Sequence, residues 1–70
     1  MEHFTNFSST TVAKIGYESS TSTLEIEFHN GNIYQYFDVP ENIWEEFKLA
    51  ASQGKFLSQF IKGQFRYSKV

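Results

Sequence analysis

The sequence predicts a small α+β domain, in which a three-stranded antiparallel β-meander is followed by two short helices packed on one sheet face (order β-β-β-α-α). Three observations support this fold class. Residues 24–28 alternate strictly between apolar and acidic side chains, as in a half-buried strand. The Asn30-Gly31 pair that follows is typical of a tight hairpin turn. Beyond Pro40, apolar residues recur at helical spacing as far as Gly63.

The length and composition of the chain limit its organisation. A chain of 70 residues has room for one domain, and the absence of cysteine excludes disulfides and thiolate metal sites. Its core has to be built from the aromatic residues, which make up 19% of the chain. We expect a single domain over residues 11–67, preceded by a loosely ordered segment at residues 1–10 and followed by a tail at residues 68–70.

The location of the protein can also be predicted from its sequence. The first residues have neither the basic region nor the apolar region of a signal peptide. No apolar run approaches the roughly 18 residues that span a bilayer. We therefore expect a cytoplasmic protein that makes no membrane contact.

The first two strands are predicted from alternating polarity. Residues 11–17 place Ala13, Ile15 and Tyr17 on one face, and a connector rich in Ser and Thr at residues 18–23 leads into the strand at residues 24–28. A two-residue type I′ turn at Asn30-Gly31 would then set the register of the hairpin.

That register assigns the side chains of the hairpin to two faces. The buried face would carry Leu24, Ile26, Phe28, Ile33, Gln35 and Phe37. The opposite face would carry Glu25, Glu27, Tyr34 and Tyr36. Gln35 would be the single polar side chain on the buried face. It is either hydrogen-bonded inside the core or placed at a groove between the sheet edge and the helices.

Two helices follow. Pro40 suits the first helical turn, where its missing N–H has no intrahelical partner, and Gly54 can adopt the left-handed conformation that ends a helix. A second, shorter helix is predicted over residues 55–62, with Gly63 closing it. The apolar side chains expected to face the sheet are Ile43, Trp44, Phe47, Ala50, Ala51, Phe56, Leu57, Phe60 and Ile61.

Charge is distributed unevenly along the chain. Residues 1–46 contain all eight acidic residues and one lysine, a charge of −7, whereas residues 47–70 contain five basic residues and no acid, a charge of +5. The candidate nucleic-acid-binding residues in this basic third are Lys48, Lys55, Lys62, Arg66, Tyr67 and Lys69. Their cations could contact a phosphate backbone while an aromatic ring stacks on a base. Alternatively, they form a solvated face that keeps the helices soluble and balances the acidic sheet.

The ordered set of motifs resembles a known family. The residues that carry the resemblance are Ile15-Gly16-Tyr17, Leu24–Phe28, Gly31, Tyr34-x-Tyr36, Val39-Pro40, Ala51-Ser52-Gln53-Gly54, Phe56-Leu57, Ile61 and Phe65. In this order and spacing they resemble the KTSC domain, a module found at the C-terminus of some lysyl-tRNA synthetases and as a free-standing small protein in bacteria. The resemblance covers residues 8–67 and implies an α+β fold, a suggested role in RNA binding and no catalytic residues. This chain departs from the family at Phe56-Leu57-Ser58, where a Tyr-Phe-Asn-like triplet is usual, and at Phe65, where Tyr is common.

Tyr34 and Tyr36 are candidate stacking residues. Two rings on one face of a sheet can stack on unpaired bases, as in RNA-recognition sheets. Alternatively, both rings pack over the side-chain stems of Glu25 and Glu27, with their phenol oxygens in water. In the expected register, those two carboxylates would repel phosphate from this face.

We predict no catalytic, cofactor-binding or metal-binding residues. His3 and His29 have no metal-ligand spacing, and no Ser-His-Asp order or nucleophile elbow occurs. Glu25 and Glu27 would lie on an open sheet without an enclosing cleft. We therefore expect a non-catalytic binding module with one of two kinds of partner. The first is nucleic acid, RNA in particular, and the second is a protein or another copy of this chain paired at an open sheet edge.

Overall fold

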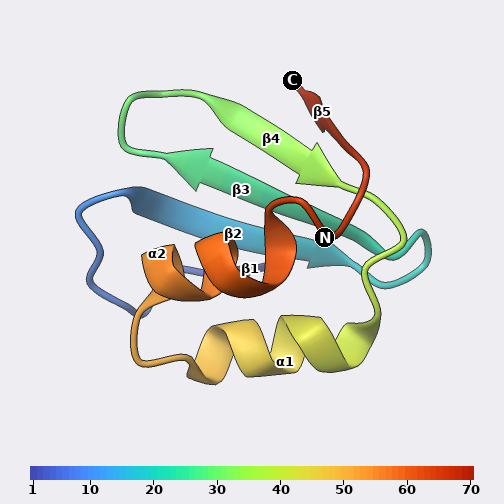
Figure 1. Cartoon of the computed structure of the whole chain (residues 1–70), viewed down its shortest axis with the longest axis horizontal. Coiled ribbons are helices and arrows are strands. Elements are labelled where there is room, and N and C mark those ends of the chain that lie inside the picture. Colours follow the sequence, from blue (N-terminus) through green and yellow to red (C-terminus); the bar gives the residue numbers. More distant parts are fainter.

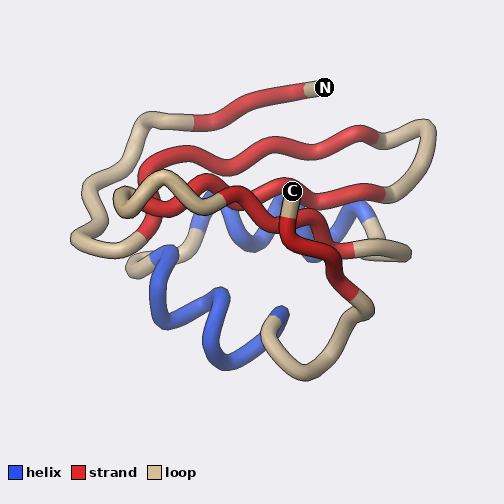
Figure 2. Tube along the Cα trace, turned by 90° about the horizontal axis from the view of Figure 1, so that it is seen from above, coloured by secondary structure: helices blue, strands red, loops and turns tan.

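A computed structural model describes all 70 residues as a five-stranded antiparallel sheet with helices on one face (Figure 1). The elements are β1 (Glu2–Phe4), β2 (Val12–Glu18), β3 (Thr23–Phe28), β4 (Ile33–Tyr36), α1 (Glu41–Leu49), α2 (Gln53–Phe56), the π-helix η1 (Leu57–Ile61) and β5 (Tyr67–Lys69). The strands lie in the sheet in their chain order, and Figure 2, seen from above, shows them running side by side with a helix partly behind them. The α+β prediction is confirmed, but the prediction of three strands is wrong. None of the helices is long and apolar enough to cross a membrane.

The two additional strands are short and lie at the sheet edges. β1 pairs with β2, and β5 pairs with β4. β1 falls within the segment for which we expected loose order, and it can approach β2 closely because residue 16 is a glycine. A Cβ on Gly16 would lie 2.8 Å from Sδ of Met1 and 2.9 Å from Nδ1 of His3. Three-residue strands have too few side chains to show an alternation, so the sequence pattern did not reveal them.

Side-chain contacts join β1 to helix α1. The carboxylate of Glu2 accepts hydrogen bonds from Nε1 of Trp44 at 3.2 Å and from Nζ of Lys48 at 3.0 Å. The hydrogen bond from Lys48, followed by that from Trp44, lowers the pKa of Glu2 below its ordinary value of 4.5. The ionised form of Glu2 therefore stabilises the folded state.

The Glu2 contacts predict a pH-dependent stability difference. Because the folded state lowers this pKa, its contribution is complete above 4.5 and is lost as the pH falls through the folded-state value. We expect Glu2→Gln to lower the urea midpoint at pH 7, and the difference from wild type to disappear in acid. The matched control is Glu46→Gln, an exposed acid of α1. A Glu2→Gln deficit of equal size at both pH values would contradict this account.

The β3–β4 hairpin has a three-residue loop in place of the expected two-residue turn. The N–H of Phe28 donates to the carbonyl of Asn32 at 2.9 Å, and the N–H of Gly31 donates to the carbonyl of Phe28 at 2.9 Å. Gly31 has a φ of 92°, but Asn30 does not have a positive φ, as a type I′ turn would require. A three-residue loop with its last residue in the left-handed region explains this geometry.

The longer loop shifts the register by one residue and exchanges the two faces of β4. Ile26 pairs with Tyr34 and Leu24 pairs with Tyr36, so both tyrosines lie on the face that packs against the helices, here called the inner face. The expected placement of Gln35 on the buried face is wrong. Gln35 lies on the opposite, outer face and donates a hydrogen bond to Glu25 at 3.0 Å. Because side chains alternate along a strand, a shift of one residue moves every one of them.

The helices differ from prediction at their junction. α1 ends at Leu49, and Gly54 lies inside the next helix without a positive φ. The hydroxyl of Ser52 accepts the N–H of Lys55 and so caps a new helix at Gln53. Gly63, with a φ of 80°, lies just beyond the second helix as predicted.

The core lies between the inner face and the helices. Its buried apolar residues are Val12, Ile15, Tyr17, Leu24, Ile26, Tyr36, Val39, Trp44, Phe47, Phe56, Leu57 and Ile61. The Trp44 ring stacks on Tyr17 at 5.6 Å, and the Tyr17 hydroxyl donates to the carbonyl of Val39 at 2.6 Å. Phe60 was expected to be buried but is 51% exposed.

Candidate ligand-binding groove

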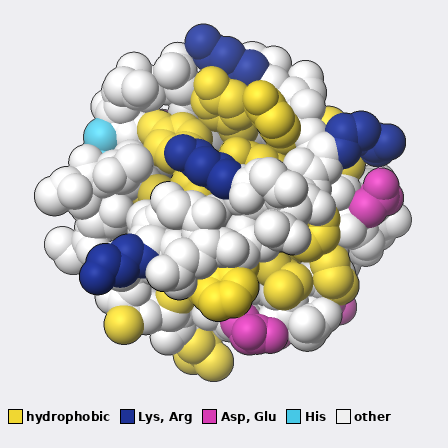
Figure 3. Space-filling model, in the orientation of Figure 1, with side chains coloured by type: hydrophobic (Ala, Val, Ile, Leu, Met, Phe, Trp, Pro, Cys, Tyr) yellow, Lys and Arg dark blue, Asp and Glu magenta, His cyan; other side chains and the backbone are white.

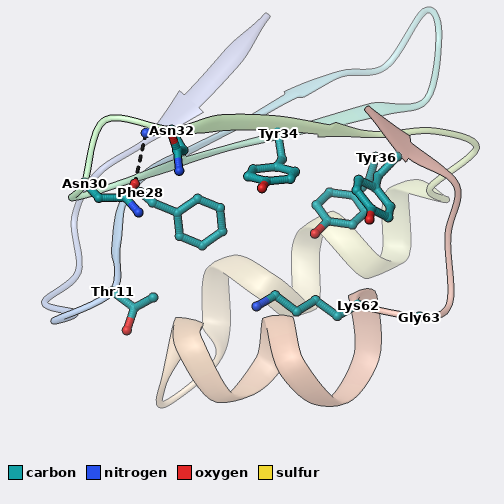
Figure 4. A pocket seen from close by; sticks show the side chains of 9 residues that line it. Thr11, Phe28, Asn30, Asn32, Tyr34, Tyr36, Lys62 and Gly63 are labelled. Atoms are coloured by element: carbon teal, nitrogen blue, oxygen red, sulfur yellow. Dashed lines mark hydrogen bonds between the residues drawn. The ribbon is translucent and has the colours of Figure 1, made fainter. Parts of the chain in front are cut away.

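A groove opens between the sheet and the end of the second helix. It has a volume of about 610 Å³. Its lining residues are Thr11, Phe28, Asn30, Asn32, Tyr34, Tyr36, Lys62, Gly63 and Tyr67. Figure 4 shows the tyrosine rings projecting from the sheet towards Lys62, with Phe28, Asn30 and Asn32 at the other end. We call this cavity the aromatic groove.

Four rings form the sheet side of the aromatic groove. The ring of Phe28 meets that of Tyr34 edge-on at 5.7 Å, and Tyr67 lies 5.9 Å from Tyr34 and 5.6 Å from Tyr36. Tyr67 is 58% exposed, whereas Tyr36 is only 3% exposed. Burial is the main cause that raises the pKa of Tyr36, and the neighbouring Tyr67 and Tyr34 add to it. Tyr36 is thus a wall residue, while the rings of Tyr34 and Tyr67 are more accessible to a ligand.

Lys62 supplies the only charge in the lining of the aromatic groove. Its backbone N–H donates to the carbonyl of Leu57 at 2.9 Å. This hydrogen bond spans five residues, as in the wide turn of a π-helix. Its ammonium lies 6.0 Å from the centre of the Phe28 ring. No acidic side chain lines the groove or forms an ion pair with Lys62. An electron-rich planar group or an anion is therefore suited to this cavity.

The six candidate residues of the basic third do not form one patch. Lys48 is held by Glu2 at 3.0 Å and Glu45 at 3.3 Å, and Arg66 lies 3.6 Å from Asp38. The space-filling view shows basic side chains dispersed over the helix-covered side, with acidic ones towards its margin (Figure 3).

The other four candidates lie at or near the cavities of this side. Lys62 and Tyr67 line the aromatic groove, and Lys69 pairs with Tyr34 and so belongs to the same face of the sheet. Lys55 is exposed on the second helix.

The corrected register changes the evaluation of Tyr34 and Tyr36. The expected packing over glutamate stems is wrong, because Glu25 and Glu27 lie on the outer face. The objection that these carboxylates would repel phosphate from the tyrosines is therefore removed.

The lining residues that sequence reasoning missed are Thr11, Phe28, Asn30, Asn32 and Gly63. Phe28, Asn30 and Asn32 share the β3–β4 hairpin, whereas Thr11 and Gly63 come from segments far from it in the chain. Phe28 was assigned to the core face, and only the three-residue loop brings the two asparagines beside it. No spacing signal in the sequence joins these residues.

Histidines and carboxylates are not gathered into a metal site. No group of three such side chains is placed to hold an ion. Nε2 of His29 lies 2.8 Å from the carbonyl oxygen of Ser9, so this ring connects the hairpin to the segment before β2.

Comparisons with known proteins agree with the fold. The KTSC domain family model matches residues 8–65. A lysine–tRNA ligase of Nostoc sp. is 48% identical over 54 residues, which cover 77% of this chain and 10% of that protein. An uncharacterised protein of Stutzerimonas stutzeri is 32% identical over 63 residues, 89% of each chain. The crystal structure of a KTSC domain protein from Yersinia pestis is similar with a TM-score of 0.85 and 40% identity, over 91% of this chain and 90% of that chain. This chain thus spans about a tenth of the length of the ligases it matches. It belongs to the KTSC domain family.

Proposed function

We propose that this KTSC domain is a non-catalytic module that binds single-stranded RNA in the aromatic groove. The observation that carries the proposal is the combination of accessible tyrosine rings with an unpaired lysine in a cavity free of acidic residues. Unpaired bases stack on such rings, and the positive charge of a lysine attracts the neighbouring phosphates of the RNA backbone.

The size and charge of the surface support the same proposal. A volume of about 610 Å³ lies within the usual range for small-ligand pockets and has room for a nucleobase. Glu25 and Glu27 lie on the outer face, so these two carboxylates do not repel a polyanion from the aromatic groove. Some relatives carry the name lysine–tRNA ligase, which names an RNA as a substrate of those proteins.

An amide-resolved NMR titration with a mixed-sequence single-stranded RNA tests the proposal. We expect shifts at Phe28, Tyr34, Lys62 and Tyr67 that weaken as salt is raised, because RNA binding releases counterions. Lys62→Gln should weaken binding and reduce the slope of log affinity against log salt by about 0.7. The matched control is Lys14→Gln, whose lysine pairs with Glu27 on the outer face.

The titration also has a result that would refute the proposal. No shifts in the groove at low salt, or equal effects of the two lysine substitutions, would show that the groove is not the RNA site.

Protein association is the second candidate function. β1 and β5 form the two edges of the sheet, and Val70, next to β5, is 70% exposed. A free edge can pair with a strand of another chain. Concentration-dependent broadening at residues 67–70 without RNA would favour this candidate, whereas spectra independent of concentration would exclude a homodimer through β5.

A further inference from the structure

A second groove continues from the aromatic groove. Its volume is about 650 Å³. Its lining residues are Ser8, Ser9, Thr10, Thr11, Ser52, Gly54, Lys55, Leu57, Ser58, Gln59 and Lys62. Thr11 and Lys62 belong to both cavities, so the two grooves are contiguous. We call the second cavity the hydroxyl groove, because six of its lining side chains are Ser or Thr.

Hydrogen bonds fix both walls of the hydroxyl groove. On one wall, the hydroxyl oxygen of Ser9 accepts the N–H of Thr11 at 3.2 Å and that of Val12 at 3.0 Å, and its carbonyl contacts His29. On the other wall, the hydroxyl oxygen of Ser52 accepts the N–H of Lys55 at 3.3 Å. These bonds hold the backbone of both walls in place, and a cavity whose walls are fixed before a ligand arrives binds it with less loss of conformational entropy.

The polar groups of this groove are suited to an anion that only accepts hydrogen bonds. Lys55 and Lys62 take part in no ion pair, and no acidic residue is among the lining side chains. The hydroxyls that take part in no hydrogen bond within the chain belong to Ser8, Thr10, Thr11 and Ser58. Hydroxyl donors together with two ammonium groups form a typical environment for a phosphate group.

We propose that the hydroxyl groove binds a phosphate group. Given the proposed function, in which RNA binds in the aromatic groove, this phosphate belongs to the RNA backbone. The base of the same RNA stacks in the aromatic groove, and Lys62 lies between the two grooves because it lines both. A free phosphate would use the same donors, and the two sources are separated by the test below.

Gly54 offers a variant pair that changes the charge of the groove with little effect on the fold. Apart from its chain neighbours and the backbone of its own helix, no atom lies within 4 Å of a Cβ built on Gly54, and its φ is not positive. Glycine is also unfavourable inside a helix, so a longer side chain is tolerated there. Gly54→Glu places a carboxylate in the groove, and Gly54→Gln places a neutral side chain of the same shape.

The experiment titrates wild type and both variants with inorganic pyrophosphate, followed by amide NMR, and then with single-stranded RNA. We expect pyrophosphate to shift the amides of residues 8–11 and 52–55 in wild type and Gly54→Gln. Gly54→Glu should weaken the binding of both pyrophosphate and RNA by about tenfold or more relative to Gly54→Gln.

Several results would overturn the phosphate site. One is the absence of pyrophosphate shifts at these residues, and another is equal shifts around Lys14 on the outer face. A third is an equal loss of pyrophosphate affinity in both Gly54 variants. If pyrophosphate behaves as expected but RNA affinity is the same in both variants, the assignment to the RNA backbone is wrong. A different result would refute the proposed function alone: RNA leaves the amide signals of Tyr34 and Tyr67 unshifted, while pyrophosphate still binds.

Discussion

Replacing Trp44 with alanine is expected to unfold most of the protein at 25 °C. The indole is fully buried, stacks on Tyr17 at 5.6 Å and donates to Glu2 at 3.2 Å. Truncation of a buried tryptophan to alanine costs about 3–5 kcal/mol. A core of this size supplies no more than about 3–5 kcal/mol of net stability, so little would remain. Far-UV circular dichroism during urea unfolding measures the effect, because the variant lacks the only tryptophan of the chain.

Leu49→Ala is the matched control for Trp44→Ala. Leu49 lies on the same helix but is 85% exposed, so its truncation should change stability by no more than about 0.5 kcal/mol. A Trp44→Ala protein with a urea midpoint near that of wild type would show that the stack on Tyr17 is not the centre of the core.

Replacing Tyr67 with alanine is expected to produce the largest loss of RNA affinity among variants that still fold. Tyr67 is 58% exposed and lies on a three-residue edge strand, so few core contacts depend on it. Its ring nonetheless lies within 6 Å of both Tyr34 and Tyr36 and completes the aromatic wall. Base stacking is worth about 1–3 kcal/mol per ring, which corresponds to a loss of roughly five- to 150-fold. Fluorescence anisotropy of a labelled single-stranded RNA measures this change.

Two further variants separate stacking from other effects of Tyr67. Tyr67→Phe keeps the ring and should retain most of the affinity. Phe60→Ala removes a ring of similar exposure, 51%, that lines neither groove, and should leave RNA affinity unchanged. Equal losses for Tyr67→Ala and Phe60→Ala would mean that the aromatic groove is not where the bases stack.

Local sequence signals determined the fold class and much of the element order. The alternation at residues 24–28 identified β3, and the apolar spacing after Pro40 identified two helices. The requirement for positive φ identified Gly63 as the end of the second helix. Each of these signals depends on neighbours within a few residues, which is why one sequence is enough to read them.

Tertiary structure decided where the functional side chains lie. The Asn30-Gly31 pair fits either a two-residue or a three-residue loop, and the difference of one residue placed Tyr34 and Tyr36 on the inner face. Packing favours this register because it places the large ring of Tyr36 in the buried core, in the same cluster as Trp44.

The grooves themselves are also products of tertiary contacts. They join the hairpin, the segment before β2, the second helix and β5, which are distant in the chain. Tertiary contacts also decide which basic residues of the last third are available to a ligand. Lys48 forms ion pairs with Glu2 and Glu45, whereas Lys55 and Lys62 form none. Periodicity within one element therefore fixes local structure, whereas surfaces built from several elements depend on register and packing that no local pattern encodes.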